Sequence, residues 1–138
     1  MIDQGLILFN VKLSVEIKRD VIEATLLFIN NTDKKLYLDG MTLCWDNKIE
    51  RDIFEIIDDN GEEVTYIKSI KNRIVRPEDY VQLNIGDQFK TTVNIKEAYD
   101  VQKGGKYIIQ YSTYNPSSYD PDDYALIKIE SNKVEITY

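Results

Sequence analysis

Alternation of apolar and polar residues near the start of the chain is the feature that most limits its fold. From Ile7 to Ile17 every odd position is apolar, and the even positions from Asn10 to Lys18 are polar or charged. Successive side chains of a β-strand point to opposite faces, so this pattern is typical of a strand with one buried and one wet face. The segment therefore predicts the first strand of a β-sheet.

A second alternating segment follows at residues 22–28 and predicts a long hairpin. Its even positions are apolar, and Arg19-Asp20 makes the turn that separates it from the first segment. The run ends at residues 30–33, where Asn, Asn, Thr and Asp are residues typical of turns. We expect the first two strands to pair with each other.

Shorter segments of the same kind recur along the chain, bounded by turn residues such as Asn60-Gly61, which favours a tight hairpin. About eight to ten strands with almost no helix predict a single all-β domain over residues 1–138, an antiparallel immunoglobulin-like β-sandwich, with a closed barrel as the alternative. The later strands are expected at Leu36–Leu38, Met41–Trp45, Ile53–Ile57, Val64–Ile67, Tyr80–Leu83, Gln88–Ile95, Lys106–Tyr114, Tyr124–Glu130 and Lys133–Tyr138, with a helical turn near Lys96–Tyr99.

One corner of the sequence supports the sandwich. Tyrosines stand on both sides of a glycine turn at Gly104-Gly105, much as in the tyrosine corner of Greek-key sandwiches. Either Tyr99 or Tyr107 is a candidate for that role. The alternative is an aromatic ring that merely packs at a sheet corner.

The chain contains no histidine and a single cysteine, Cys44. The missing histidine excludes Ser/His/Asp and Cys/His nucleophile pairs and the HExxH zinc helix. An internal disulfide is impossible, and Cys44 is expected to be buried as a small hydrophobe. We therefore expect a protein that is not an enzyme and that has no cofactor.

The excess of acidic over basic residues limits the classes of partner that we expect. Lysine and arginine number 17 against 24 aspartates and glutamates, a formal charge of −7. Nucleic acid and anionic lipid are not expected as partners, because binding to phosphate depends on clustered Lys and Arg. No run of about 18 apolar residues predicts a membrane span, and residues 1–20 lack the pattern of a secretory signal. The chain is expected to be soluble, cytoplasmic if Met1 is native and extracytoplasmic if a signal peptide was removed.

Several short segments within residues 24–111 together form a recognisable series. They are Asp52–Ile56, Asn60-Gly61, Val64–Tyr66, Arg73, Glu78–Leu83, Gly86-Asp87, Thr91–Ile95, Glu97–Val101, Gly104, Tyr107 and Gln110-Tyr111. In order and spacing they resemble the non-catalytic β-domain that precedes the protease domain in deuterolysin-like and peptidyl-Lys zinc metalloendopeptidases, the aspzincins. The zinc helix and the aspartate ligand of that family have no counterpart here, so its catalytic activity does not transfer.

The resemblance implies a function in binding. A stand-alone copy of a domain that normally packs against a protease is expected to be a propeptide-like inhibitor or immunity-type protein that binds a zinc metallopeptidase in trans. A rigid sandwich presents loops that lose little entropy on binding. The alternative is a carbohydrate-binding or structural accessory β-sandwich domain, which would show stacking aromatics on one flat face.

A tyrosine-rich segment near the C-terminal end is the first candidate partner-binding surface. Tyrosine offers a large contact area with only two side-chain torsions and is enriched at binding surfaces. The alternative is that these tyrosines cover the edge of the sandwich. The candidate residues are Tyr111, Tyr114, Asn115, Pro116, Tyr119, Asp120, Pro121 and Tyr124.

Two further segments are candidates for partner contacts. Trp45 is the only tryptophan, and together with Arg51 it would make a good anchor if exposed. The alternative is that Trp45 packs into the core, as most tryptophans do. The basic stretch Lys68, Lys71, Arg73 and Arg76 is a solvated loop or a surface that steers an acidic partner.

An acidic loop and the edge of the first strand offer two further possibilities. Asp120, Asp122 and Asp123 place three carboxylates on one loop, as a calcium site requires, but their spacing is not that of an EF-hand. We expect solvated carboxylates there and no metal. A weak homodimer through the edge of the long first strand is the alternative to a monomer.

Overall fold

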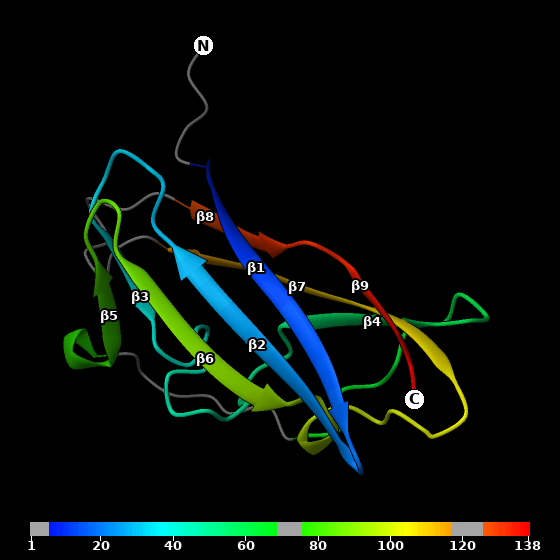
Figure 1. The fold of residues 1–138 in the computed structure, drawn as a ribbon. Coiled ribbons are helices and arrows are strands. Elements are labelled where there is room, and N and C mark those ends of the chain that lie inside the picture. Colours follow the sequence, from blue (N-terminus) through cyan, green and yellow to red (C-terminus); the bar gives the residue numbers. More distant parts are fainter. Residues whose placement is uncertain (1–5, 69–75, 117–125) are drawn as a thin grey trace.

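The computed structural model describes residues 6–68, 76–116 and 126–138, and within these ranges it is built of strands with no α-helix (Figure 1). The predicted all-β sandwich is confirmed. No described helix has the length or apolarity that crossing a membrane requires. The elements are β1 (Leu6–Lys18), β2 (Val21–Ile29), β3 (Leu36–Asp39), β4 (Phe54–Asp58), the 3₁₀ turn η1 (Pro77–Asp79), β5 (Tyr80–Leu83), β6 (Gln88–Asn94), the 3₁₀ turn η2 (Ile95–Glu97), β7 (Lys106–Pro116), β8 (Leu126–Ser131) and β9 (Val134–Thr137).

The strands form two layers that share one long strand. The main order is β4-β7-β8-β1-β2-β6, with β9 also paired to β7, and β3 pairs β5 separately. The first half of β7 pairs β4 and β9, whereas the second half, from Ser112 onward, pairs β8. Figure 1 shows β1, β2 and β6 side by side, with the later part of β7 crossing behind β1. β7 therefore joins the layer of β4 to the layer of β1.

The β1–β2 hairpin forms as predicted. The two strands pair antiparallel, and Lys18 lies opposite Val21 across the turn at Arg19-Asp20. The side chains of β2 alternate between partly exposed and fully buried, with the even positions 22–28 at 0% exposure. β2 is thus anchored by a regular apolar face that packs into the core, and its backbone pairing holds β1 beside it.

A row of aromatic rings in edge or tilted contact crosses the core. The ring centroids of successive pairs lie 5.4–6.2 Å apart. Such pairs contribute about 0.5–1.5 kcal/mol each beyond the area they bury. In order, the row is Phe89, Phe28, Tyr111, Phe54, Tyr99 and Tyr66.

In the segment between β8 and β9, side chains make the backbone hydrogen bonds that a neighbouring strand makes elsewhere in the sheet. β1 runs parallel to β8 only as far as Val11, which lies opposite Ser131. The Asn132 amide then accepts the Leu13 N–H at 2.9 Å and donates to the Leu13 carbonyl at 3.0 Å. Ser131 Oγ accepts the Tyr111 N–H at 2.9 Å. These two polar side chains keep the backbone hydrogen bonded at the point where the layers separate.

The tyrosine corner is formed by Tyr107 at the start of β7. Its hydroxyl accepts the Gln102 N–H at 3.1 Å and donates to the Gln102 carbonyl at 3.0 Å. The ring lies against Gly105, where an added Cβ would come within 2.9 Å of ring atoms. A glycine before Tyr107 is therefore required for this packing.

Tyr99, the other candidate for the corner, has a different role. Its hydroxyl accepts the N–H groups of Ile53 and Phe54 at 3.0 and 2.9 Å and donates to an Asp52 carboxylate oxygen at 2.8 Å. Burial raises the pKa of the Tyr99 hydroxyl well above its usual range. Tyr99 thus satisfies two buried N–H groups at the start of β4.

Two predicted strands do not form. Residues 41–45 make successive turns, because the Asp39 carbonyl accepts the N–H groups of Thr42 and Leu43 and so bends the backbone. Residues 64–67 contribute only a single bridge, between Tyr66 and Tyr99. The strands on either side of these segments do not pair with the next strand in sequence, as successive hairpins would. Instead β3 pairs with β5, and β6 pairs with β2.

Candidate functional site

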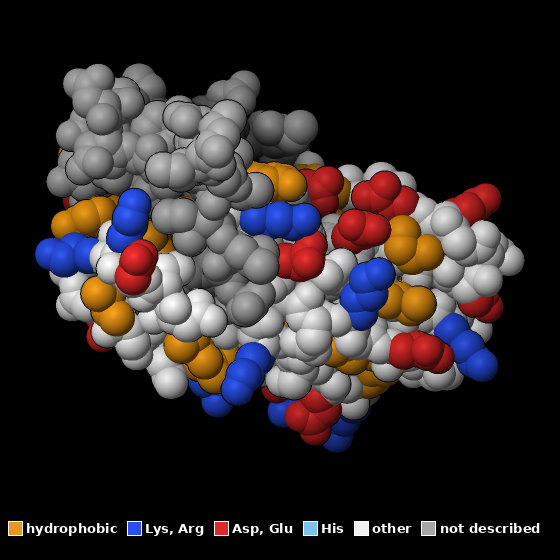
Figure 2. All heavy atoms as spheres, turned by 90° about the horizontal axis from the view of Figure 1, so that it is seen from above, with side chains coloured by type: hydrophobic (Ala, Val, Ile, Leu, Met, Phe, Trp, Pro, Cys, Tyr) orange, Lys and Arg blue, Asp and Glu red, His pale blue; other side chains and the backbone are white. Residues whose placement is uncertain are grey.

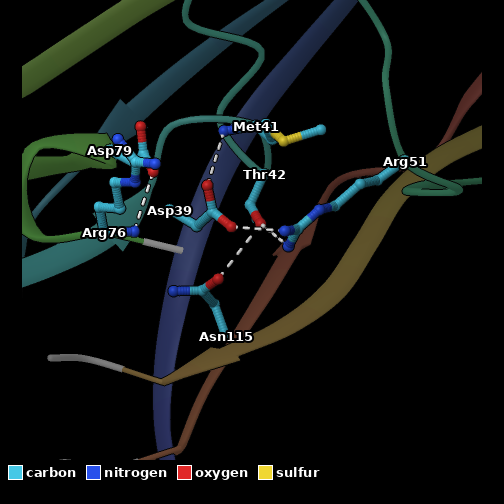
Figure 3. Close-up of polar contacts among 7 residues, drawn as sticks. All are labelled: Asp39, Met41, Thr42, Arg51, Arg76, Asp79 and Asn115. Carbon is cyan, nitrogen blue, oxygen red and sulfur yellow. Dashed lines mark hydrogen bonds and ion pairs between the residues drawn. The ribbon is translucent and has the colours of Figure 1, made fainter. Parts of the chain in front are cut away.

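The loop between β3 and β4, residues 40–53, lies where the ends of β3, β5 and β7 meet, and we call it the Trp45 loop. At its start, the Gly40 N–H donates to the Asp79 carbonyl of η1 at 2.9 Å. Thr42 Oγ1 donates to Asn115 Oδ1 of β7 at 3.2 Å (Figure 3). Segments far apart in the sequence therefore hold the loop from two sides.

An ion pair between half-buried Arg51 and buried Asp39 fixes the Trp45 loop from within (Figure 3). Arg51 Nη2 lies 2.6 Å from Asp39 Oδ2, whose side chain is only 4% exposed. The other carboxylate oxygen of Asp39 accepts the Met41 N–H at 3.0 Å, and Arg51 Nη1 donates to Thr42 Oγ1 at 3.4 Å. Because a buried carboxylate is costly without a partner, Arg51 and Asp39 hold the two ends of the loop together.

The backbone of the loop turns Trp45 away from the core. Cys44 and Asn47 both adopt left-handed conformations, with φ of 53° and 63°. The strain is offset by polar contacts with β6: Thr91 Oγ1 donates to the Cys44 carbonyl at 2.8 Å, and Asn47 Nδ2 donates to the Thr92 carbonyl at 3.0 Å. Left-handed non-glycine residues persist only where the surroundings enforce them. The direction of Trp45 is therefore built into the fold.

The Trp45 side chain is 42% exposed and lies flat against Gly40. A Cβ added at Gly40 would come within 2.5 Å of a ring carbon of Trp45. The alternative that Trp45 packs into the core is therefore wrong. One face of the indole ring covers the Gly40 backbone, and the rest remains accessible to solvent.

The other predicted partner-binding residues occupy different environments. Tyr111 and Asn115 are 0% and 2% exposed, so both belong to the interior and offer no surface to a partner. Tyr111 OH donates to the Thr42 carbonyl, which supports the Trp45 loop from beneath. Tyr114 is 55% exposed, with the Lys128 ammonium 5.8 Å from its ring centroid.

Of the two arginines of the predicted set, Arg51 lies within the Trp45 loop and Arg76 lies close to the start of the loop. Arg51 is half-buried by its pairing with Asp39, and Arg76 is exposed just before η1. In the basic stretch, Lys68 donates to the Ile49 carbonyl at 2.6 Å. The structure thus brings Trp45, Arg51 and Arg76 to one end of the sandwich.

Several predicted residues lie outside the described part of the chain. They are Lys71, Arg73, Tyr119, Asp120, Pro121, Asp122, Asp123 and Tyr124, and the side chain of Pro116 belongs with them. The expectation of solvated carboxylates at Asp120, Asp122 and Asp123 therefore lies outside the described residues. Among the residues that are described, no group of three acidic, cysteine or histidine side chains is placed to hold a metal ion.

Cys44 is buried as predicted, and its surroundings make it a poor nucleophile. Burial, together with the nearby carboxylates of Asp46, Glu97 and Glu50, raises the pKa of the thiol to about 12. The thiolate is the reactive form of cysteine, so this side chain stays unreactive at neutral pH.

No protein-family model matches this chain, and no significant match was found among curated proteins. The case for a function therefore depends on the chemistry of the site. Most polar side chains of the Trp45 loop bind other parts of the same molecule, and the indole ring of Trp45 is the large group that they leave accessible.

Gly40→Ala is expected to displace the Trp45 ring and to cost about 1–3 kcal/mol of stability, as overpacking does. Trp45 is the only tryptophan, so fluorescence excited at a wavelength that tyrosine does not absorb reports on this loop alone. We expect a changed emission maximum together with a lower urea midpoint. Gly105→Ala is the matched control, because its Cβ meets the Tyr107 ring and should lower stability without changing the emission. Unchanged emission in Gly40→Ala would contradict this account of the loop.

Proposed function

We propose that this chain is a non-catalytic protein-binding module that recognises its partner through the Trp45 loop. The observation that supports the proposal most is the exposure of Trp45, 42%, on a backbone that the Asp39–Arg51 ion pair holds in place. Tryptophan is among the residues that contribute most to binding energy at protein interfaces.

The fixed conformation of the loop is the second line of support. Ordering a loop and its side chains on binding opposes association, and a loop that is already ordered avoids that cost. Here the contacts of Asp39 with Arg51, and of Asn47 with β6, are formed within the free chain. Trp45 is thus ready to insert into a pocket of a partner without rearrangement.

The partner that we propose is a zinc metallopeptidase, with this chain as a propeptide-like inhibitor. This part of the proposal rests on the resemblance of residues 24–111 to the β-domain of the aspzincins. The domain needs no catalytic group for that function, because covering the substrate cleft of the peptidase is enough to inhibit it.

The experiment measures inhibition and affinity for a purified aspzincin, with the wild-type chain and with Trp45→Ala. Loss of an interface hot spot costs about 2 kcal/mol or more, so the variant should bind about 30-fold more weakly or worse. Ile85→Ala is the control, since Ile85 is 65% exposed in a different loop and should leave binding unchanged.

The outcomes separate the parts of the proposal. If no aspzincin forms a complex or is inhibited, the partner class is wrong. If a complex forms and Trp45→Ala binds as tightly as wild type, the Trp45 loop is not the interface. A glycan array tests the accessory-domain alternative: a glycan bound by wild type and lost in Trp45→Ala would replace the protein partner with a carbohydrate.

A further inference from the structure

The outer face of β4, β7 and β9 carries a second surface that the Trp45 loop does not reach. Ile57, Ile108 and Glu135 lie directly opposite one another in adjacent strands and point away from the core. Asn115, which supports the Trp45 loop, lies seven positions after Ile108 along β7. In an extended strand this separates the two residues by roughly 23 Å. The two surfaces are therefore separate.

This row lines a hollow of about 150 Å³ on the surface. Ile57 and Ile108 provide its apolar part, and Ile108 is 42% exposed. On an open sheet face an apolar side chain with this exposure gains stability when a partner covers it. At the end of the molecule formed by β4 and the start of β7, on the right in both views, Figure 2 shows hydrophobic side chains among acidic and basic ones.

Charges surround the hollow unevenly. Asp58, Asp59 and Glu135 contribute three carboxylates, and Lys106 contributes one ammonium group. Asp58 is held in place, because its carboxylate accepts the N–H groups of Asn60 and Glu62, each at 2.9 Å. The apolar centre thus has negative charge at the turn after β4 and at β9, on either side of it.

We propose that this hollow binds an arginine or lysine side chain of a protein partner. Such a side chain combines a long apolar stem with a cationic head. The stem would lie along Ile57 and Ile108, and the head would reach Glu135 or Asp59. A purely apolar side chain would leave the carboxylates without a partner, and an acidic one would be repelled. A second copy of this chain is disfavoured as the occupant by its own charge of −7.

The test is a titration of the ¹⁵N-labelled full chain, followed by NMR. The probe is the peptide acetyl-Leu-Arg-Leu-amide, and the same peptide with glutamate or norleucine in place of arginine serves for comparison. We expect saturable shifts at the amides of Ile57, Ile108 and Glu135 with the arginine peptide, weakened by added salt. Glu135→Lys and Ile108→Ser should each weaken binding by about tenfold or more.

Two control variants keep this test independent of the proposed function. Ile85→Ser changes an exposed isoleucine elsewhere, and Trp45→Ala removes the anchor of the other surface; neither should alter the titration. No saturable shift, equal binding of the norleucine peptide, or full binding by Glu135→Lys would each overturn the proposal. So would shifts of the same amides with protein concentration alone, because they would identify a second copy as the occupant.

Discussion

Replacing Asn30 by aspartate is expected to lower the free energy of unfolding by about 3–5 kcal/mol, as losing one partner of a buried polar network does. The Asn30 side chain is fully buried at the end of β2. Its amide nitrogen donates to the carbonyls of Lys34, Leu83 and Asn84 at 2.8, 2.9 and 3.2 Å. A carboxylate in the same position would place a negative charge against three carbonyl oxygens and could donate to none of them.

Asn31→Asp is the matched control, since it makes the same chemical change at an exposed position one residue away. Urea unfolding of both variants at pH 7 measures the difference, and the control should stay within about 0.5 kcal/mol of wild type. Equal stabilities of the two variants would show that the Asn30 network adds little to the fold.

Raising the pH from 8 to 11 is expected to destabilise the protein by several kcal/mol, because three buried acidic protons are held more tightly in the folded state. Burial raises the pKa of Cys44 from 9.0 to about 12, and it also raises the pKa values of Tyr99 and Tyr111. The unfolded chain releases these protons near pH 9 and 10, and the folded chain keeps them. Stability is therefore complete below pH 9 and falls by about 1.4 kcal/mol per pH unit for each group above its unfolded pKa.

Urea unfolding at pH 8, 9, 10 and 11 tests this expectation. The thiol makes the largest single contribution between pH 9 and 10, so Cys44→Ala should make the decline in that interval shallower and leave the tyrosine contribution, which grows above pH 10. A free energy of unfolding that stays constant from pH 8 to 11 would contradict the burial of all three groups.

The strands that the sequence predicts best are those whose side chains alternate regularly between the core and solvent. β1, β2 and β6 have one face against the core and one toward solvent, and their alternation is visible without a structure. Tyr107 was also predictable as a corner residue, because the signal, a glycine turn before a tyrosine, is local. Residues 41–45 were mispredicted as a strand, since their apolar content reflects burial in a turn, and periodicity cannot distinguish the two.

The candidate site was predictable only in part. Trp45 and Arg51 stand out by residue type. The exposure of Trp45, however, depends on the left-handed backbone of Cys44 and on the packing of the indole ring against Gly40, and no pattern in the sequence predicts either feature. The role of Asp39 was missed, because Asp39-Gly40 has the composition of an ordinary turn and its pairing with Arg51 forms only in three dimensions. Tyr111 was assigned to the surface because tyrosine is common there, whereas its place in β7 puts it in the core.

The parallel pairing of β1 with β8 has a consequence for how the chain reaches its native state. Leu6 lies opposite Leu126 and Val11 opposite Ser131, so the first strand cannot complete its hydrogen bonds on that side until β8 has been synthesised. Contacts between segments so distant in sequence slow folding, because the loop that they close must be ordered before they form. During synthesis, the β1–β2 hairpin therefore has one unprotected edge, and this nascent stage is when a chaperone or a neighbouring chain has the best access to it.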